Sequence, residues 1–352
     1  MKQSIEKMLG LGQTGIVGLD IGSSSVKLVQ LHNSNGHWTV TAADIVKIAN
    51  TSKHDKDCAE PNISKAIGDY IESTGVQRQF AVCGVSGQEV AVRNFSFPYL
   101  PQEKIKNAVY LEAMQVCPFN IDDASFDYQL INDGENNING VFAAATNRII
   151  EKKSQFAKEA GFQTALMDVD GLALLNCFHK SQETEVRQPT AILNVGYSYT
   201  NLVIMDNEDL SFVRDIPYAG EAIVNKIAGE NNVSAETVKR TLLNCENQPK
   251  FESELAAGLF EACQKLVCDI TETLRYYTTQ KRDASIEKIF VCGGFAMVNG
   301  FVEVLDEQLP KQVVLWNPFE NLCYNINKGN NKVTYEDGPS LAVAIGLAMR
   351  SM

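Results

Sequence analysis

The sequence lacks the features of several common classes of protein. Its 352 residues contain 31 Lys and Arg against 43 Asp and Glu, a formal net charge of −12 at pH 7. This acidic balance lacks the electrostatic footprint of a nucleic-acid-binding protein, and an anionic membrane surface would repel it. No uncharged apolar run reaches the roughly 18 residues that a membrane-spanning helix needs. Residues 8–19 resemble a signal peptide only weakly, because they contain Gln13 and run into Asp20 without a cleavage site, so we do not expect secretion.

Disulfide and zinc signatures are missing as well. The nine cysteines form no CxxC pair, and most lie in apolar runs such as residues 80–85, a pattern typical of reduced, buried cysteines in a cytosolic protein. The four histidines have neither HExxH nor CxxH spacing and predict no zinc site. Neither a Rossmann glycine fingerprint after a strand nor a P-loop motif is present. The apolar share of 45% is nevertheless enough for sizeable cores, and the length fits about two domains.

What the sequence does contain is one internal repeat. Residues 19–29 (LDIGSSSVKLV) align with residues 193–203 (LNVGYSYTNLV), and in both an apolar strand leads into a glycine-containing polar turn and a returning strand. This order predicts a hairpin. A third strand follows each hairpin, at 37–48 and 210–217, and then a helical pattern, at 63–74 and after Gly220. We expect two similar α/β halves with a ligand cleft between them, although two such hairpins can also resemble each other by chance.

The remaining elements follow from apolar periodicity and from proline and glycine positions. The clearest is a long helix that runs from Phe251 to the polar stretch beginning at Gln280. The polar stretch 179–189 is the best candidate for a linker. We further predict a helix after Pro101, strands at 124–131, 140–146 and 163–170, helices at 148–160 and 172–178, and a buried helix at 341–349.

The first turn has the residues of an anion-binding site. Gly22 and the three serines after it lie between two predicted strands, where successive backbone N–H groups and hydroxyls can surround a phosphate. Lys27 could add positive charge, and Asp20 could hold Mg²⁺ through water. An ordinary polar hairpin would have the same residues. The matching second turn strengthens the interpretation, because a triphosphate with Mg²⁺ needs donors from two sides.

A third glycine-containing element lies near the C-terminus. Residues 289–292 predict a buried strand, and Gly293, Gly294 and Phe295 follow it. Paired glycines at the end of a strand allow a flat ring to lie against the backbone, and ligands favour such strand ends in α/β sheets. A tight turn without a ligand is the alternative.

The order of these three elements resembles the actin-like ATPase superfamily, which includes actin, heat-shock chaperone ATPases, sugar kinases and the division protein FtsA. Within it the chain is similar to the PilM family of type IV pilus assembly, on the evidence of YLEAMQVCPFNIDDASFDYQLI at 110–131, MDVDGLALLNCF at 167–178 and RDIPYAGEAIVNKIA at 214–228. This resemblance implies an α/β fold that is actin-like (ribonuclease H-like and duplicated), with two lobes around a nucleotide cleft. The implied first lobe comprises 1–97, 147–180 and 335–352, an inserted subdomain comprises 98–146, and the second lobe comprises 181–334 with a helical subdomain at about 221–282.

The resemblance also implies a ligand, ATP or ADP with Mg²⁺, and a role for each matching residue. Asp20 and Asn194 would hold the metal through water, and Asp170 would orient the attacking water, or else only cap its helix. Glu236 and Lys239 would lie over the nucleoside, or else only form a first helical turn capped by Ser234. The phosphate-binding residues would be Gly22, Ser23, Ser24, Ser25, Lys27, Gly196, Tyr197, Ser198, Tyr199 and Thr200. The nucleoside-binding residues would be Gly220, Glu221, Glu236, Lys239, Gly293, Gly294, Phe295 and Asn299.

Two departures from the superfamily bear on activity. Asn194 stands where an aspartate is common, which removes a negative charge near the metal, and Tyr197 and Tyr199 replace small residues. We therefore expect ATP binding with slow or absent hydrolysis. The resemblance implies a cytoplasmic adaptor that binds the N-terminal tail of PilN in a groove between the first lobe and the inserted subdomain. Other pilus platform proteins and motor ATPases would be further partners, and the inner membrane would be reached only through partners. A small-molecule kinase and an FtsA-like filament-forming ATPase are the alternatives.

Overall fold

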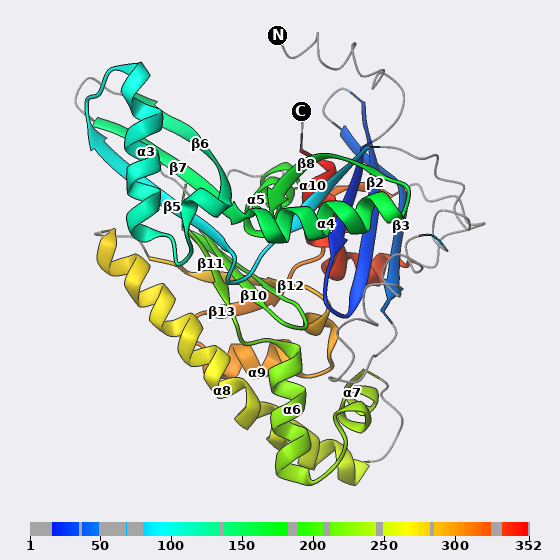
Figure 1. Ribbon diagram of the computed structural model, residues 1–352. Helices are drawn as coiled ribbons and strands as arrows, with labels where there is room; N and C mark the ends of the chain where they lie inside the picture. The colour runs from blue at the N-terminus through cyan, green and yellow to red at the C-terminus, as the bar shows by residue number, and fades with distance from the viewer. Residues whose placement is uncertain are drawn as a thin grey trace. The chain divides into compact units, whose positions relative to one another are not determined.

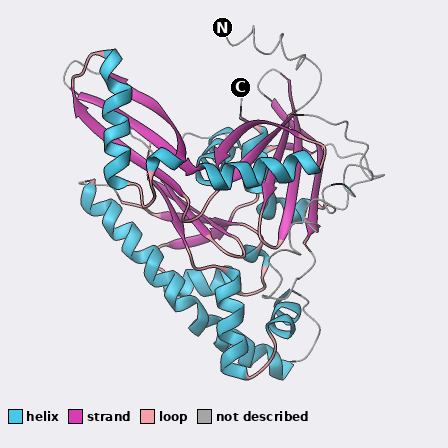
Figure 2. Ribbon diagram, viewed as in Figure 1, coloured by secondary structure: helices cyan, strands magenta, loops and turns pink. Residues whose placement is uncertain are grey.

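The computed structural model describes residues 16–34, 37–48, 68, 80–133, 137–181, 189–206, 212–243, 249–281, 285–324 and 333–350. The chain forms two compact units (Figures 1 and 2). The first comprises residues 1–183 and 318–352, and the second comprises residues 184–317.

The first unit is built on a six-stranded sheet in the order β14-β3-β2-β1-β4-β8. Strands β1, β2 and β3 are antiparallel neighbours, and β4 and β8 continue the sheet parallel to β1. Strand β14 pairs with β3, although the sequence analysis placed its residues in the second lobe. The strand bounds are β1 (Val17–Ile21), β2 (Ser25–Ser34), β3 (His37–Lys47), β4 (Phe80–Val85), β8 (Gln163–Val169) and β14 (Cys323–Tyr324).

Helices cover both faces of this sheet. Leu19 shares a core with Phe156 of α4 (Asn147–Glu159), whereas the neighbouring Gly18 faces the backbone of α10 (Ala342–Ala348). Because successive residues of a strand point to opposite faces, α4 and α10 lie on opposite sides. Helix α5 (Asp170–Ser181) packs against α10, and every residue of α10 is buried. Two short 3-10 helices, η3 (Pro318–Asn321) and η4 (Tyr335–Leu341), precede β14 and α10.

One buried carboxylate lies beside this C-terminal helix. The Asp168 Oδ2 atom is 3.4 Å from Nε of Arg350, which follows α10. Burial raises the pKa of the Asp168 carboxyl above its ordinary value of 3.8, while the Arg350 charge and the backbone N–H of Val169 oppose the shift.

The inserted subdomain is a three-stranded antiparallel sheet, β5-β7-β6, with α3 on one face (Figure 2). Ile105, Val109 and Ala113 recur every four residues along α3 and contact the sheet in a separate core. The sheet begins at Val90 and not near residue 98, because β5 pairs with β7 along its whole length. The bounds are β5 (Val90–Pro98), α3 (Gln102–Val116), the 3-10 helix η1 (Ile121–Asp123), β6 (Ala124–Asp133) and β7 (Asn137–Thr146).

The second unit repeats the topology of the first. Its sheet has the order β11-β10-β9-β12-β13, in which β9, β10 and β11 are antiparallel and β12 and β13 run parallel to β9. This matches β3-β2-β1-β4-β8, so the duplication predicted from the two turns is confirmed. The bounds are β9 (Thr190–Val195), β10 (Thr200–Met205), β11 (Phe212–Ile216), β12 (Lys288–Cys292) and β13 (Gln312–Leu315).

The helices of the second unit share one large core with its sheet. Leu259, Leu266 and Ile270 are buried along one side of α8, as the apolar spacing predicts. The helix bounds are α6 (Gly220–Asn231), α7 (Ala235–Leu243), α8 (Pro249–Gln280), the 3-10 helix η2 (Phe295–Met297) and α9 (Phe301–Gln308).

Most elements predicted from periodicity are confirmed. The helical pattern at 63–74 lies outside the described residues, apart from Gly68, which is in a helical conformation. The stretch predicted as a linker, 179–189, lies mostly outside the described residues, and its first three residues belong to α5, which ends at Ser181. The confirmed elements are the strands at 124–131, 140–146 and 163–170, and the helices after Pro101 and at 148–160, 172–178, 251–280 and 341–349.

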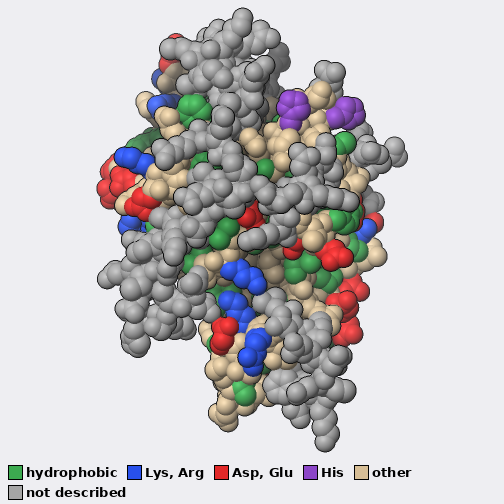
Figure 3. Space-filling view, turned by 90° about the vertical axis from the view of Figure 1, so that its right-hand side faces the viewer, with side chains coloured by type: hydrophobic (Ala, Val, Ile, Leu, Met, Phe, Trp, Pro, Cys, Tyr) green, Lys and Arg blue, Asp and Glu red, His purple; other side chains and the backbone are tan. Residues whose placement is uncertain are grey.

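Three further observations concern the described residues as a group. No helix among them is both long and apolar enough to cross a membrane. In the face shown in Figure 3, acidic and basic side chains lie close to one another among the described residues. Of the described cysteines, Cys263 is buried, and burial raises the pKa of its thiol to about 12. Cys83, Cys177 and Cys292 are buried as well, whereas Cys268 and Cys323 are exposed, so most of the described cysteines are buried, as predicted.

Candidate functional site

The two turns have the same backbone geometry. The Gly22 N–H donates to the Ser25 carbonyl (3.0 Å), and the Gly196 N–H donates to the Tyr199 carbonyl (3.1 Å). A Cβ atom added to either glycine would lie 3.0 Å from that same carbonyl oxygen. Each glycine N–H therefore closes its hairpin, and a phosphate at either turn would be bound by the backbone and hydroxyl groups that follow.

The first turn follows a buried ion pair. The register of β1 and β2 places Asp20 opposite Lys27, and the Lys27 Nζ atom lies 2.9 Å from the Asp20 Oδ2 atom. Both side chains are only 11% exposed. Lys27, which we expected beside a phosphate, therefore forms an ion pair with Asp20, the carboxylate that we expected beside the metal ion.

A second lysine reaches the same turn, and the sequence analysis missed it. Lys153 of α4 donates a hydrogen bond from Nζ to the Ile21 carbonyl, directly before Gly22. On the other side, the Ile48 N–H donates to the Ser24 carbonyl and fixes the turn (2.9 Å). Lys153 follows another lysine on a polar helix, so its sequence context does not distinguish it from a surface residue.

Asp170 lies at the same edge of the first sheet as this turn. It begins α5 directly after β8, and β1, β4 and β8 are parallel, so their C-terminal ends meet at one edge. Its side chain is buried, and a Cβ atom at Gly84 of β4 would come within 2.2 Å of its Oδ1 atom. A carboxylate in the first turn of a helix is also favoured by the helix dipole. The position is therefore compatible with both predicted roles.

The second turn carries a neutral counterpart of the ion pair. Asn194 Nδ2 donates to Asn201 Oδ1 (2.7 Å), and Asn201 Nδ2 donates to Asp215 Oδ1 (2.7 Å). Because Asp215 accepts from Asn201, the amide of Asn201 must present its oxygen to Asn194. These two hydrogen bonds fix the orientation of the Asn194 amide, whose Oδ1 atom faces Gly293.

Two helices contact the second turn. The N–H groups of Gly220 and Glu221 donate to the carbonyls of Gly196 (3.1 Å) and Tyr197 (2.7 Å), so the first turn of α6 is tied to it. The Lys239 Nζ atom of α7 lies 5.0 Å from the centre of the Tyr197 ring, a cation–π distance.

Helix α7 also carries a carboxylate that affects Tyr197 and has a capped N-terminus. Burial raises the pKa of Tyr197, and the carboxylates of Glu221 and Glu236 raise it further. Glu236 therefore also acts on the second turn. The Thr237 N–H donates to Ser234 Oγ (3.1 Å), so the helix cap that we gave as the alternative role of this segment is present as well.

The third glycine-containing element packs against the same turn. Gly293 has φ +100°, and a Cβ atom there would lie 2.4 Å from the Val195 carbonyl oxygen. Gly294 is exposed, and a Cβ atom there would meet nothing within 4 Å. The Phe295 ring lies directly against Gly220.

Most of the residues predicted for the nucleoside are therefore neighbours within the second unit. Asn299 is exposed in the turn before α9. No three His, Cys, Asp or Glu side chains gather into a metal site within the described ranges.

Solved structures share this architecture. A chain of a "PilM-PilN type IV pilus biogenesis complex" superposes with a TM-score of 0.79 at 22% identity, covering 96% of this chain and 99% of that one. The ethanolamine utilization protein EutJ from Carboxydothermus hydrogenoformans has a TM-score of 0.55 at 13% identity, with 99% of both chains covered. A diol dehydratase-reactivating factor in nucleotide-free form has a TM-score of 0.55 at 10% identity, covering 95% and 99%.

These likenesses define the class: the chain has the actin-like fold of two α/β lobes. A family model described as "Type IV pilus assembly protein PilM" matches residues 18–352, which is nearly the whole chain. The chain therefore belongs to the PilM family of type IV pilus assembly proteins, as its sequence motifs indicated.

Proposed function

We propose that this chain is an ATP-binding adaptor of the type IV pilus assembly platform, with slow or absent hydrolysis. Membership of the PilM family supports the role in pilus assembly. One observation carries the nucleotide proposal: the second turn, the start of α6, Lys239 and the Gly293–Phe295 segment contact one another in one unit. The first unit repeats the same turn, with serines after its glycine.

Each group of residues then has a chemical task. The open backbone at Gly294 would accept the flat face of adenine, with Phe295 and Gly220 beside it. The serine hydroxyls and backbone N–H groups of the two turns would bind the phosphates. Asp20 and Asn194 would receive hydrogen bonds from water molecules of a Mg²⁺ ion.

Weak hydrolysis is expected from the charges near the metal. The charge of Asp20 is balanced by Lys27 at 2.9 Å, and the second turn has the neutral Asn194–Asn201 pair in the matching place. Little net negative charge therefore remains at these two positions to hold Mg²⁺. Steady-state turnover should stay below ~1 per second, near the lower end of ordinary enzymes. A faster rate in purified protein would contradict the proposal. Asp170→Asn should remove any turnover and leave ATP binding unchanged.

We further propose that the chain binds the N-terminal cytoplasmic tail of a PilN protein and reaches the inner membrane only through such partners. One structurally similar chain comes from a PilM–PilN complex. The inserted subdomain also leaves large apolar side chains on α3 exposed, with Leu111 58% and Met114 51% accessible. Exposed apolar side chains of this size on one helix fit a protein-binding surface.

The test is a titration of a fluorescent PilN-tail peptide with and without Mg–ATP. Binding to the full chain is expected, and Leu111→Glu should weaken it at least tenfold, because a charge would replace an apolar contact. Lys106→Glu, on the same helix and also exposed, is the matched control and should change it little. Absence of binding with and without ATP would favour a kinase or a filament-forming protein. Equal effects of the two variants would remove α3 from the peptide site.

A further inference from the structure

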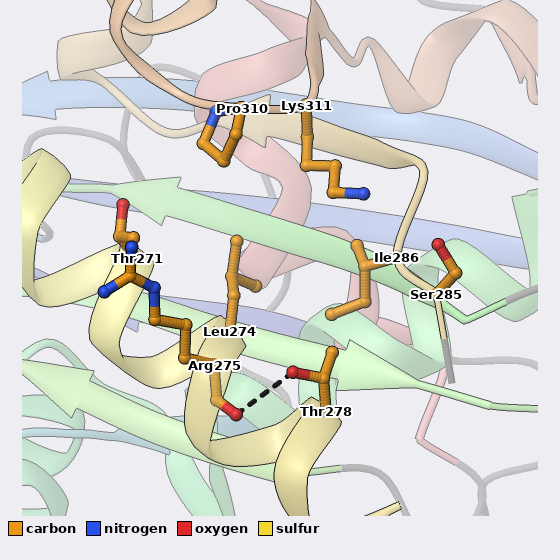
Figure 4. Close-up of a pocket in the computed structure, with 8 residues that line it drawn as sticks. All are labelled: Thr271, Leu274, Arg275, Thr278, Ser285, Ile286, Pro310 and Lys311. Atoms are coloured by element: carbon orange, nitrogen blue, oxygen red, sulfur yellow. Dashed lines mark hydrogen bonds between the residues drawn. The ribbon is translucent and has the colours of Figure 1, made fainter. Parts of the chain in front are cut away.

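The second unit contains a pocket at the end of its sheet opposite the proposed nucleotide site. The pocket has a volume of about 410 Å³ and lies between α8 and the segments that precede β12 and β13 (Figure 4). Ile286 precedes β12, and Lys311 precedes β13, so the pocket adjoins the N-terminal ends of these parallel strands. Gly293 follows the C-terminal end of β12. The pocket and the proposed nucleotide site are therefore separate.

Two positively charged side chains line the pocket, one on each of two opposite walls. Arg275 belongs to α8, and Lys311 belongs to the facing segment (Figure 4). Neither forms an ion pair with a carboxylate within the part of the chain that the structure describes.

The floor between the cations is apolar. Leu274 and Ile286 are buried, and Pro310 lies beside Lys311 at the rim. Thr271 adds a hydroxyl next to Arg275. The pocket therefore offers positive charge at its two walls and an apolar surface between them.

We propose that this pocket binds a short acidic segment of a protein partner, with carboxylates on Arg275 and Lys311 and an apolar side chain on the floor. A free inorganic anion would use the two cations but make no contact with the apolar lining between them. A long polyacidic chain would be repelled by the net charge of the protein. One or two carboxylates next to a leucine-sized side chain match both the charge and the apolar area.

The proposal predicts selective binding of a defined probe to the full chain. The probe is a fluorescein-labelled octapeptide of alternating Glu and Leu, and its comparison peptide has Gln in place of Glu. The Glu peptide should bind at least tenfold more tightly. Arg275→Gln and Lys311→Gln should each weaken it about fivefold, the effect of losing one exposed charge pair. Lys265→Gln removes a charge of α8 that lies outside the pocket and pairs with Asp269, so its effect should be small.

Three results would overturn the proposal. Equal affinity for the Glu and Gln peptides would show that charge is not recognised. Unchanged affinity in both Arg275→Gln and Lys311→Gln would place the peptide elsewhere. Displacement of the Glu peptide by an equal concentration of inorganic phosphate would show a simple anion site. Failure of Mg–ATP to displace the peptide is expected, which separates this test from that of the nucleotide proposal.

Discussion

The neighbouring glycines Gly293 and Gly294 should respond to substitution in opposite ways. At Gly293, a side chain must adopt φ +100°, which costs about 1–3 kcal/mol. Its Cβ atom would also lie 2.4 Å from the Val195 carbonyl oxygen, which forces β9 and β12 apart at a cost of about 1–3 kcal/mol. Gly293→Ala should therefore destabilise the second unit by about 3 kcal/mol, which lowers its unfolding temperature by about 10 °C.

Gly294 is the internal control for this prediction. Its backbone is helical, with φ −65° and ψ −29°, and there is open space around a Cβ atom. Gly294→Ala should leave stability unchanged or raise it by about 0.4–1 kcal/mol. If adenine lies against this backbone, Gly294→Leu should lower ATP affinity at least tenfold without loss of stability.

The assay is thermal unfolding followed by circular dichroism, combined with ATP titration of each variant. Because two units can unfold in separate steps, each transition must be fitted on its own. A Gly293→Ala protein that melts with the wild type would show that the tight contact with Val195 is wrong. A Gly294→Leu protein that binds ATP normally would remove this glycine from the nucleotide site.

Three further predictions concern buried and exposed polar groups. Lys27→Met leaves the buried carboxylate of Asp20 unpaired and should lower the free energy of unfolding, measured in urea, by about 3–5 kcal/mol. The double variant Asp20→Asn/Lys27→Asn copies the amide pair of the second unit and should recover most of this loss. The pKa of Asp168 is higher in the folded chain than in the unfolded chain, so the unfolded chain loses this proton at a lower pH. The free energy of unfolding therefore falls as pH rises above 3.8. Asp168→Asn should thus melt higher than the wild type at pH 7, by a margin that shrinks as pH falls towards 4; a constant margin would contradict this. Iodoacetamide at pH 8 should label Cys268 rapidly and Cys263 only on unfolding, as read by peptide mass mapping, and equal labelling of the native protein would refute the burial.

Local chemistry made part of the fold predictable. A strand, a glycine turn and a returning strand are specified by a few adjacent residues, so the two hairpins and the duplication could be predicted from LDIGSSS and LNVGYSY. Helix α8 was predictable because its buried residues recur with the helical period. Long-range pairing was not predictable in the same way. Strand β14 joins β3 through only two residue pairs, between segments far apart in the sequence.

The candidate site, like the fold, was only partly predictable from the sequence. The residue types of both turns pointed to an anion site, but their partners depend on register and packing. Lys27 was expected at a phosphate, whereas the register of the hairpin places it across from Asp20. Lys153 reaches the first turn only because of how α4 packs on the sheet. The sequence could not distinguish Gly293 from Gly294 either, because the difference arises from the pairing of Cys292 with Asn194.

The account rests on the first turn as a binding site for phosphate and on the second unit as the binding site for adenosine. The most direct test is to measure the affinities of ATP and adenosine for Ser24→Phe, with Ser96→Phe on the exposed side of β5 as the control. We predict that Ser24→Phe loses the additional affinity of ATP over adenosine but still binds adenosine through the second unit, and that the control binds both normally. Unchanged ATP affinity in Ser24→Phe would contradict the account.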